Sequence, residues 1–360
     1  MASIRARVLA VGGVMLAVTA SQGAAQVTYP NVRVGGRLQT QAYYFGNEED
    51  TAATGSTNNF MIRRARIQAS GQISETVSFI IMPSFEEGST RLRLRDAWID
   101  IGFQRGEPKT RFTLRMGQEK RPFNRYELLT SNNLPSLERG AGRGLIRAAS
   151  NDIFTASGFL SHDVGASLII NSRLNEGQAL TFQAGVYNGE GESRNDVNDK
   201  KSFGIRATAG VTSKLNLGAS FFSHDGVNGP DSSYTNSAIG VDAQWGRPGD
   251  EGLFLVGDFM TGENRTDNDI KMQGFQVVGA YHIRMKSPTA FLYAIEPAAR
   301  FDLADPDKDT DDDGATLISA GINVYFSSRA QFRAMFESQS FQASGSSSIT
   351  GIRSGFNVNF

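Results

Sequence analysis

Residues 349–360 read ITGIRSGFNVNF. Large apolar side chains occupy one parity of this stretch, namely Ile352, Phe356, Val358 and Phe360. Arg353 and Asn357 fall on the other parity. A two-residue period with one apolar and one polar face predicts a β-strand that lies between two different environments.

The same alternation recurs along the chain. Ile239 and Val241, for example, alternate with Gly240 and Asp242. Sixteen segments follow this pattern: 31–45, 59–73, 76–86, 90–103, 110–118, 164–174, 180–189, 202–212, 214–225, 234–246, 252–263, 270–283, 290–302, 315–327, 330–341 and 349–360. A weaker segment, 151–159, would make seventeen. We place it inside a loop, because bacterial single-chain barrels have even strand numbers.

The connections between these segments alternate in length. The short ones are 71–75, 104–109, 174–179, 212–214, 246–251, 284–289 and 327–330. The longer, more polar ones are 46–58, 119–163, 189–201, 225–233, 262–269, 302–314 and 342–348, with a short exception near 86–90. Short turns on one rim and long loops on the other are typical of outer-membrane barrels, and sixteen strands enclose an aqueous lumen. The sequence therefore predicts an all-β, transmembrane, antiparallel barrel.

The N-terminus predicts export. Arg5 and Arg7 precede a 13-residue apolar run, Val8 to Ala20, which is too short to span a bilayer as a helix. We therefore expect a cleaved signal peptide at 1–25 and a barrel domain at 26–360. The chain has no cysteine, so no disulfide stabilises it. Its mean hydropathy of −0.30 is expected where lipid-facing and lumen-facing residues alternate. Composition alone would also fit a large soluble β protein.

Basic residues gather in the first third of the mature chain. Residues 26–150 hold 18 Arg and Lys against 12 Asp and Glu, and the remainder is net acidic. The parity of the predicted strands turns five of these bases toward the lumen: Arg37, Arg64, Arg66, Arg111 and Arg115. The same parity places Phe60 and Ile62 inward. Inward placement is favoured because an arginine facing lipid at mid-depth costs about 2–4 kcal/mol.

In 90–103 the parity conflicts. Ile99 and Ile101 on the lipid face would also turn Arg91, Arg93 and Arg95 outward. Either a bulge shifts the phase near Arg95, or these arginines lie above the membrane or at a subunit contact.

The longest connection, 119–163, is the third on the long-loop rim. It carries Lys120, Arg121 and Arg125 at its start and further bases at Arg139, Arg143 and Arg147. A loop of this length is usually functional or disordered. We expect it to fold inward and narrow the pore, where grouped guanidinium groups attract anions. Alternatively, its bases pair with acids such as Asp96, Asp100 and Glu119, or with lipopolysaccharide phosphates.

Six blocks resemble the phosphate-selective porins of the O and P type: FMIRRARI at 60–67, LRDAWID at 94–100, MGQEKRPF at 116–123, LERG at 137–140, HDVG at 162–165 and GVYNG at 185–189. The resemblance implies a sixteen-stranded, generally trimeric barrel with an arginine- and lysine-lined pore for anions. Because that family is broad, it does not fix the substrate.

No other group of residues predicts catalysis. The three histidines, His162, His224 and His282, sit in no spaced metal motif, although a Ser-His pair is left open. Alternating carboxylates in one loop, Asp305, Asp307, Asp309, Asp311 and Asp313, are a candidate for weak Ca²⁺ binding. A solvated loop is the preferred interpretation, and we expect no cofactor.

Three function classes follow. We expect an outer-membrane channel for small anions, phosphate or related oxyanions; the alternatives are a general diffusion porin, or an enzyme or adhesin on a barrel. Its expected partners are the lipid bilayer, lipopolysaccharide, further copies in a homotrimer, and the barrel-assembly machinery through Phe360, a final aromatic like that of outer-membrane proteins. We expect no nucleic-acid partner.

Overall fold

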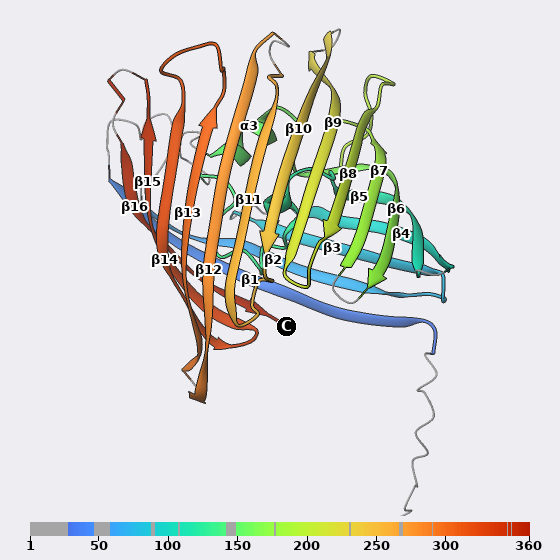
Figure 1. Cartoon of the computed structure of the whole chain (residues 1–360), viewed down its shortest axis with the longest axis horizontal. Helices are drawn as coiled ribbons and strands as arrows, with labels where there is room; N and C mark the ends of the chain where they lie inside the picture. The colour runs from blue at the N-terminus through green and yellow to red at the C-terminus, as the bar shows by residue number, and fades with distance from the viewer. Residues whose placement is uncertain are drawn as a thin grey trace, which may run out of the picture.

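The chain is a closed barrel of sixteen antiparallel strands (Figure 1). The computed structural model describes residues 28–46, 58–87, 91–106, 109–141, 149–175, 178–229, 232–265, 269–289, 291–343, 345–346 and 348–360. The strands are β1 Asn31–Gly46, β2 Asn58–Gln72, β3 Val77–Glu86, β4 Arg93–Arg105, β5 Thr110–Lys120, β6 His162–Asn175, β7 Gln178–Tyr187, β8 Ser202–Gly210, β9 Leu215–Gly229, β10 Ser232–Trp245, β11 Gly252–Glu263, β12 Lys271–Thr289, β13 Leu292–Asp305, β14 Ala315–Ser327, β15 Ala330–Phe341 and β16 Ile349–Asn359. The sixteen-stranded prediction is confirmed.

The seam between β1 and β16 closes the barrel. Arg37 lies opposite Asn359 near the short-turn rim, and Gly46 lies opposite Thr350 near the other rim. Beyond β16, the backbone of Phe360 exchanges two hydrogen bonds with Gly36, at 2.9 and 3.1 Å. Because β1 also pairs with β2, every strand has two neighbours and no sheet edge remains.

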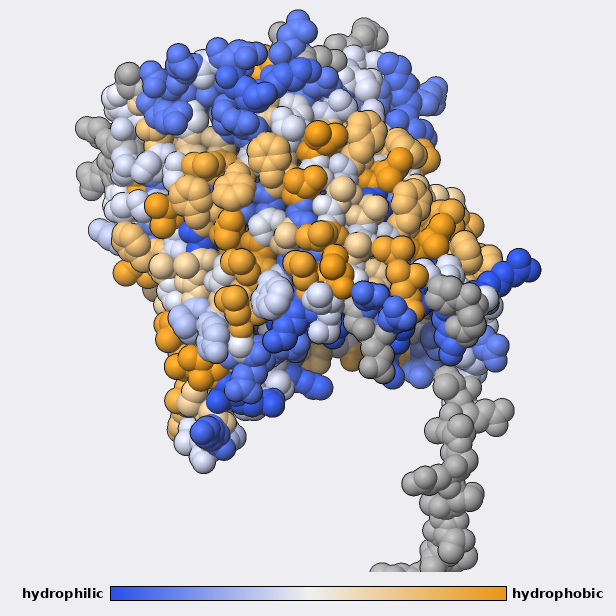
Figure 2. All heavy atoms as spheres, viewed as in Figure 1, coloured by the Kyte–Doolittle hydropathy of each residue, from blue (hydrophilic) through white to orange (hydrophobic). Residues whose placement is uncertain are grey.

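The barrel is apolar outside and polar inside. Ile352 and Phe356 of β16 are more than half exposed on the outer surface, whereas Arg353 and Asn357 are buried inside. Figure 2 shows the outer apolar side chains as a band with hydrophilic residues above and below it. This arrangement suits a hydrocarbon layer around the barrel and water within it.

Two short helices lie in the long connection between β5 and β6: α2, Arg125–Leu128, and α3, Ser150–Ala156. The weak segment 151–159 is thus largely helical rather than a seventeenth strand. Within the described residues, no helix is both long and apolar enough to cross a bilayer.

Three details differ from the sequence-based expectation. The connection expected at 284–289 belongs to β12, which continues to Thr289. The connection expected at 225–233 is reduced to 230–231, because antiparallel pairing of β9 and β10 continues to Gly229 and Ser232. Phe60 and Ile62 are 84% and 52% exposed rather than inward, because a bulge in β2 changes the parity. The expected signal peptide, 1–25, lies outside the described residues.

Candidate functional site

The segment between β5 and β6 packs onto the inner wall of the barrel. Its apolar side chains meet small or apolar ones from β7 and β9–β15. The largest cluster comprises Phe123, Ile153, Phe154, Phe159 and Leu160 of the segment with Tyr187, Phe222, Ala238, Met260, Met272 and Ala304 of the wall. Leu137 joins another cluster with Ala280, Ala298 and Met335. This half of the lumen is therefore filled.

Three buried arginines hold the backbone of the same segment. Arg300 of β13 donates to the carbonyl oxygen of Glu138 at 2.9 Å. Arg333 of β15 donates to that of Leu134 at 2.9 Å, and Arg353 of β16 donates to that of Ala141 at 2.8 Å. Charged donors to buried carbonyl oxygens are worth about 1.5–3 kcal/mol each, so these contacts fix the path of the loop.

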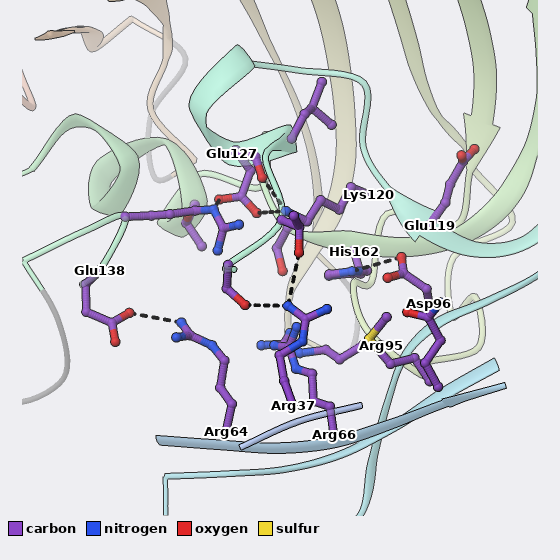
Figure 3. Close-up of a pocket in the computed structure, with 18 of the residues that line it drawn as sticks. Arg37, Arg64, Arg66, Arg95, Asp96, Glu119, Lys120, Glu127, Glu138 and His162 are labelled. Atoms are coloured by element: carbon purple, nitrogen blue, oxygen red, sulfur yellow. Dashed lines mark hydrogen bonds and ion pairs between the residues drawn. The ribbon is translucent and has the colours of Figure 1, made fainter. Parts of the chain in front are cut away.

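A cavity of about 610 Å³ remains between this loop and β1–β7 (Figure 3). Eight basic residues line it: Arg37, Arg63, Arg64, Arg66, Arg95, Arg115, Lys120 and Arg139. Six acidic residues line it as well: Glu87, Asp96, Glu119, Glu127, Glu138 and Asp152. We call this cavity the aperture; its charged lining has a basic excess.

Two β-bulges each deliver a pair of charged neighbours to the aperture. The β1–β2 register steps from Gln39 opposite Arg64 to Thr40 opposite Ile62, so Arg63 and Arg64 both turn inward. The β3–β4 register shifts in the same way, and Arg95 and Asp96 both line the aperture. A bulge leaves one extra residue in a strand and re-aims side chains, which explains both departures from strict alternation.

Most of the bases have a carboxylate partner. Glu86 of β3 pairs with both Arg66 and Arg95, and Arg95 also lies 3.0 Å from Glu192. Arg115 lies 2.8 Å from Asp100 and 3.0 Å from Glu119. These pairs match the alternative in which lumenal acids compensate the arginines.

Loop acids pair with four further bases. Glu127 lies 3.5 Å from Lys120 and 3.3 Å from Arg139. Glu138 pairs with Arg63 at 2.6 Å and with Arg64 at 3.0 Å. Burial alone would raise the pKa of the Glu138 carboxyl group, but the two guanidinium groups outweigh burial and hold this pKa well below 4.5.

Arg37 differs from the other seven bases. Its Nη1 donates to the hydroxyl groups of Thr130 and Ser131 at 3.1 and 2.7 Å. In the part of the chain that the structure describes, Arg37 forms no ion pair, although it is only 8% exposed. Figure 3 shows it between Arg64 and Arg66 on the strand side of the aperture. Its charge is therefore the least compensated of the cluster.

The structure brings together five of the predicted site residues and separates three. The five that line the aperture are Arg37, Arg64, Arg66, Arg115 and Lys120.

Arg111 is exposed at the short-turn side, where its guanidinium group lies against Gly102. Arg121 pairs with Asp163 at 2.7 Å, and Arg125 pairs with Asp242 at 3.4 Å. Because each of these bases binds an acid on the barrel wall, neither reaches the aperture.

The structure also locates the arginines of 90–103, whose orientation the sequence left open, and the acidic residues of 305–313. Of Arg91, Arg93 and Arg95, only Arg95 lines the aperture; Arg91 and Arg93 are exposed above it. The described residues contain no group of three acidic or histidine side chains that could hold a metal ion. Weak Ca²⁺ binding by the carboxylates of 305–313 stays a prediction.

Arg63, Arg139 and the three loop-holding arginines were missed as site residues. The Arg63-Arg64 doublet is a signal for a bulge, since strict alternation would turn one of the two toward lipid. Arg300, Arg333 and Arg353 have inward parity but gave no signal for binding a loop, because the sequence does not reveal the path of the loop backbone.

Comparisons with solved structures find the same fold. An anion-selective porin from Comamonas acidovorans matches with 14% identity and a TM-score of 0.63, covering 92% of this chain and 100% of that one. OmpT of Vibrio cholerae, in its trimer form, matches with 12% identity and a TM-score of 0.56, covering 92% and 99%. The channel DcaP of Acinetobacter baumannii matches with 12% identity and a TM-score of 0.57, covering 92% and 97%.

Curated protein sequences give no match. A family model does match: the phosphate-selective porin O and P model covers residues 32–248, more than half of the chain. The chain therefore belongs to the phosphate-selective porin O and P family and is a porin of the bacterial outer membrane.

Proposed function

We propose that this porin passes small anions by passive diffusion, with phosphate or related oxyanions as its substrate class. The observation that carries the proposal is the guanidinium group of Arg37, which forms no ion pair among the described residues, in an aperture whose lining has more bases than acids. A fixed positive charge in a narrow lumen raises the local concentration of anions and repels cations. A guanidinium group also offers paired donors that match oxyanion geometry.

The surroundings of Arg37 support this role. Thr130 and Ser131 orient its guanidinium group without neutralising it, because hydroxyl groups carry no charge. Arg66 and Arg139 add positive potential nearby. Their own partners, Glu86 and Glu127, hold them in place. An entering anion would meet a charged donor that is already positioned.

The extensive ion pairing favours a second candidate, a general diffusion porin whose lumenal charges only shape the pore. In that case removing Arg37 would change selectivity little. The match to the phosphate-selective porin family and the likeness to the anion-selective porin from Comamonas acidovorans both favour the first candidate. The trimer form of the Vibrio cholerae protein supports a homotrimeric assembly.

Planar-bilayer currents from Arg37→Gln test the proposal. This change removes one positive charge and leaves no carboxylate unpaired, so the barrel is expected to fold normally. We expect the chloride-to-potassium permeability ratio to fall and phosphate to block the chloride current less. The matched control is Lys214→Gln, which removes the same charge from an exposed turn. Unchanged selectivity in Arg37→Gln would favour the general diffusion porin.

A further inference from the structure

A second cavity shares a wall with the aperture. It has a volume of about 260 Å³ and is lined by Arg121, Arg194, Arg265, His224, Tyr234 and residues of the connection 188–201. Thr155, Ser161 and His162 line both this cavity and the aperture. These three residues therefore form the boundary between a chamber beside the long loops and the basic aperture.

His162 is the titratable member of this boundary. Its side chain is buried, and neither ring nitrogen has a hydrogen-bond partner among the described residues. The nearest carboxylate oxygen is Oδ1 of Asp96, 3.4 Å from Nε2 (Figure 3). His224 lines the second cavity too, but its ring nitrogens lie 3.2 Å from the Ser202 hydroxyl and 3.1 Å from the Tyr234 hydroxyl. Only His162 combines an unsatisfied ring with a place at the boundary.

Charged groups face His162 from several elements. Asp96 and Arg95 approach from β4, and Lys120 lies directly opposite on β5. Glu127 acts from α2, and Glu192 of the connection 188–201 lines the second cavity. Arg95 and Lys120 already have carboxylate partners in Glu86 and Glu127. Among the described residues, His162 is the group within 4 Å of the Asp96 carboxylate that can gain a positive charge, so the compensation of the Asp96 charge depends on the protonation of this ring.

We propose that His162 is a specificity-determining residue at the boundary between the two cavities, and that its proton controls how strongly the Asp96 carboxylate repels anions. The inference rests on the anion-channel function proposed above. With His162 neutral, Asp96 presents a negative charge to the aperture. With His162 protonated, the two groups form an ion pair and this charge is cancelled. Histidine ordinarily titrates between pH 5 and 8; burial opposes protonation of this ring and the Asp96 carboxylate favours it, so the response belongs on the acid side of neutral pH.

The test is the chloride-to-potassium permeability ratio at pH 8 and pH 5 for wild type, His162→Gln, Asp96→Asn and His224→Gln. A charge on the aperture wall changes the local concentrations of anions and cations in opposite directions, so we expect the wild-type ratio to rise at least about twofold at pH 5. His162→Gln should lose this rise. Asp96→Asn should raise the ratio at pH 8 and shift the response to lower pH, because the protonated ring loses its partner.

His224→Gln should keep the wild-type response, since His224 lies outside the shared boundary. Each variant is checked for heat-modifiable migration, which reports a folded barrel. An equal rise in His162→Gln and wild type, or a loss of the rise in His224→Gln, would overturn the proposal. An anion-selective wild type with no pH response would also overturn it while leaving the proposed function intact. A cation-selective wild type at both pH values would reject the proposed function itself.

Discussion

The carboxylate of Glu138 lies 2.6 Å from the Nε of Arg63, and this pair ties the loop between β5 and β6 to strand β2. The backbone oxygen of the same glutamate accepts a hydrogen bond from Arg300 on β13. Glu138 thus links two distant parts of the barrel wall through the loop. The size of the aperture should therefore respond to changes at this residue.

Replacing Glu138 with Gln should loosen the loop and increase anion preference. The change leaves Arg63 and Arg64 without their shared acid, and breaking a buried ion pair in this way costs about 3–5 kcal/mol. Single-channel recordings should show a noisier current and a higher chloride-to-potassium ratio. Glu75→Gln, at an exposed turn, serves as the control. A quiet channel with wild-type selectivity would contradict the linking role.

The same ion pair predicts a response to strong acid. Because the pKa of Glu138 is depressed in the folded barrel, its contribution to loop docking is present above about pH 4.5 and is lost as pH falls through the lower, folded-state value. Current noise should therefore stay low at pH 5 and rise only at distinctly lower pH. Glu138→Gln should be noisy at every pH. A rise in wild-type noise between pH 7 and pH 5 would speak against this assignment.

Arg333→Gln should enlarge the pore. Arg333 donates to the backbone oxygens of Leu134 and Asn132, and its loss leaves buried acceptors unsatisfied. We expect destabilisation of about 1–3 kcal/mol, measured as a lower unfolding temperature, together with higher single-channel conductance. Selectivity should change less than in Arg37→Gln, since Arg333 does not line the aperture. Unaltered conductance would show that the apolar contacts alone hold the loop.

Gly36→Ala should weaken barrel closure. A Cβ atom on Gly36 would meet the backbone oxygen of Arg66 and the ring of Phe360. Overpacking of this kind costs about 1–3 kcal/mol, and the folded, heat-modifiable fraction should fall. Gly46→Ala lies at the other end of the same seam, where a Cβ would find its nearest neighbour at 3.9 Å, and should have little effect. Equal behaviour of the two variants would rule out tight packing at Phe360.

Strand parity predicted much of the site from the sequence. Arg37, Arg64, Arg66 and Arg115 have the parity opposite to the lipid-facing residues, and the hydrocarbon layer enforces that pattern strongly. Parity fails where a bulge inserts a residue, which is why Phe60 lies outside and Arg63 inside.

The destination of the loop bases could not be predicted in the same way. Arg121 and Arg125 follow β5 directly, but each binds an acid that is distant in sequence or on another strand. Only the path of the loop decides which base reaches the aperture. That path depends on tertiary contacts, among them the apolar cluster around Phe123 and the hydrogen bonds from Arg300, Arg333 and Arg353.

The most direct test of the central claim is the reversal potential of the wild-type channel in a KCl gradient, measured before and after phosphate is added. We expect a potential whose sign reports chloride as the more permeant ion, and a chloride current that phosphate reduces. Selectivity should weaken at high salt, where screening shortens to about 3 Å at 1 M. A reversal potential that reports potassium as the more permeant ion would contradict the anion pathway through Arg37.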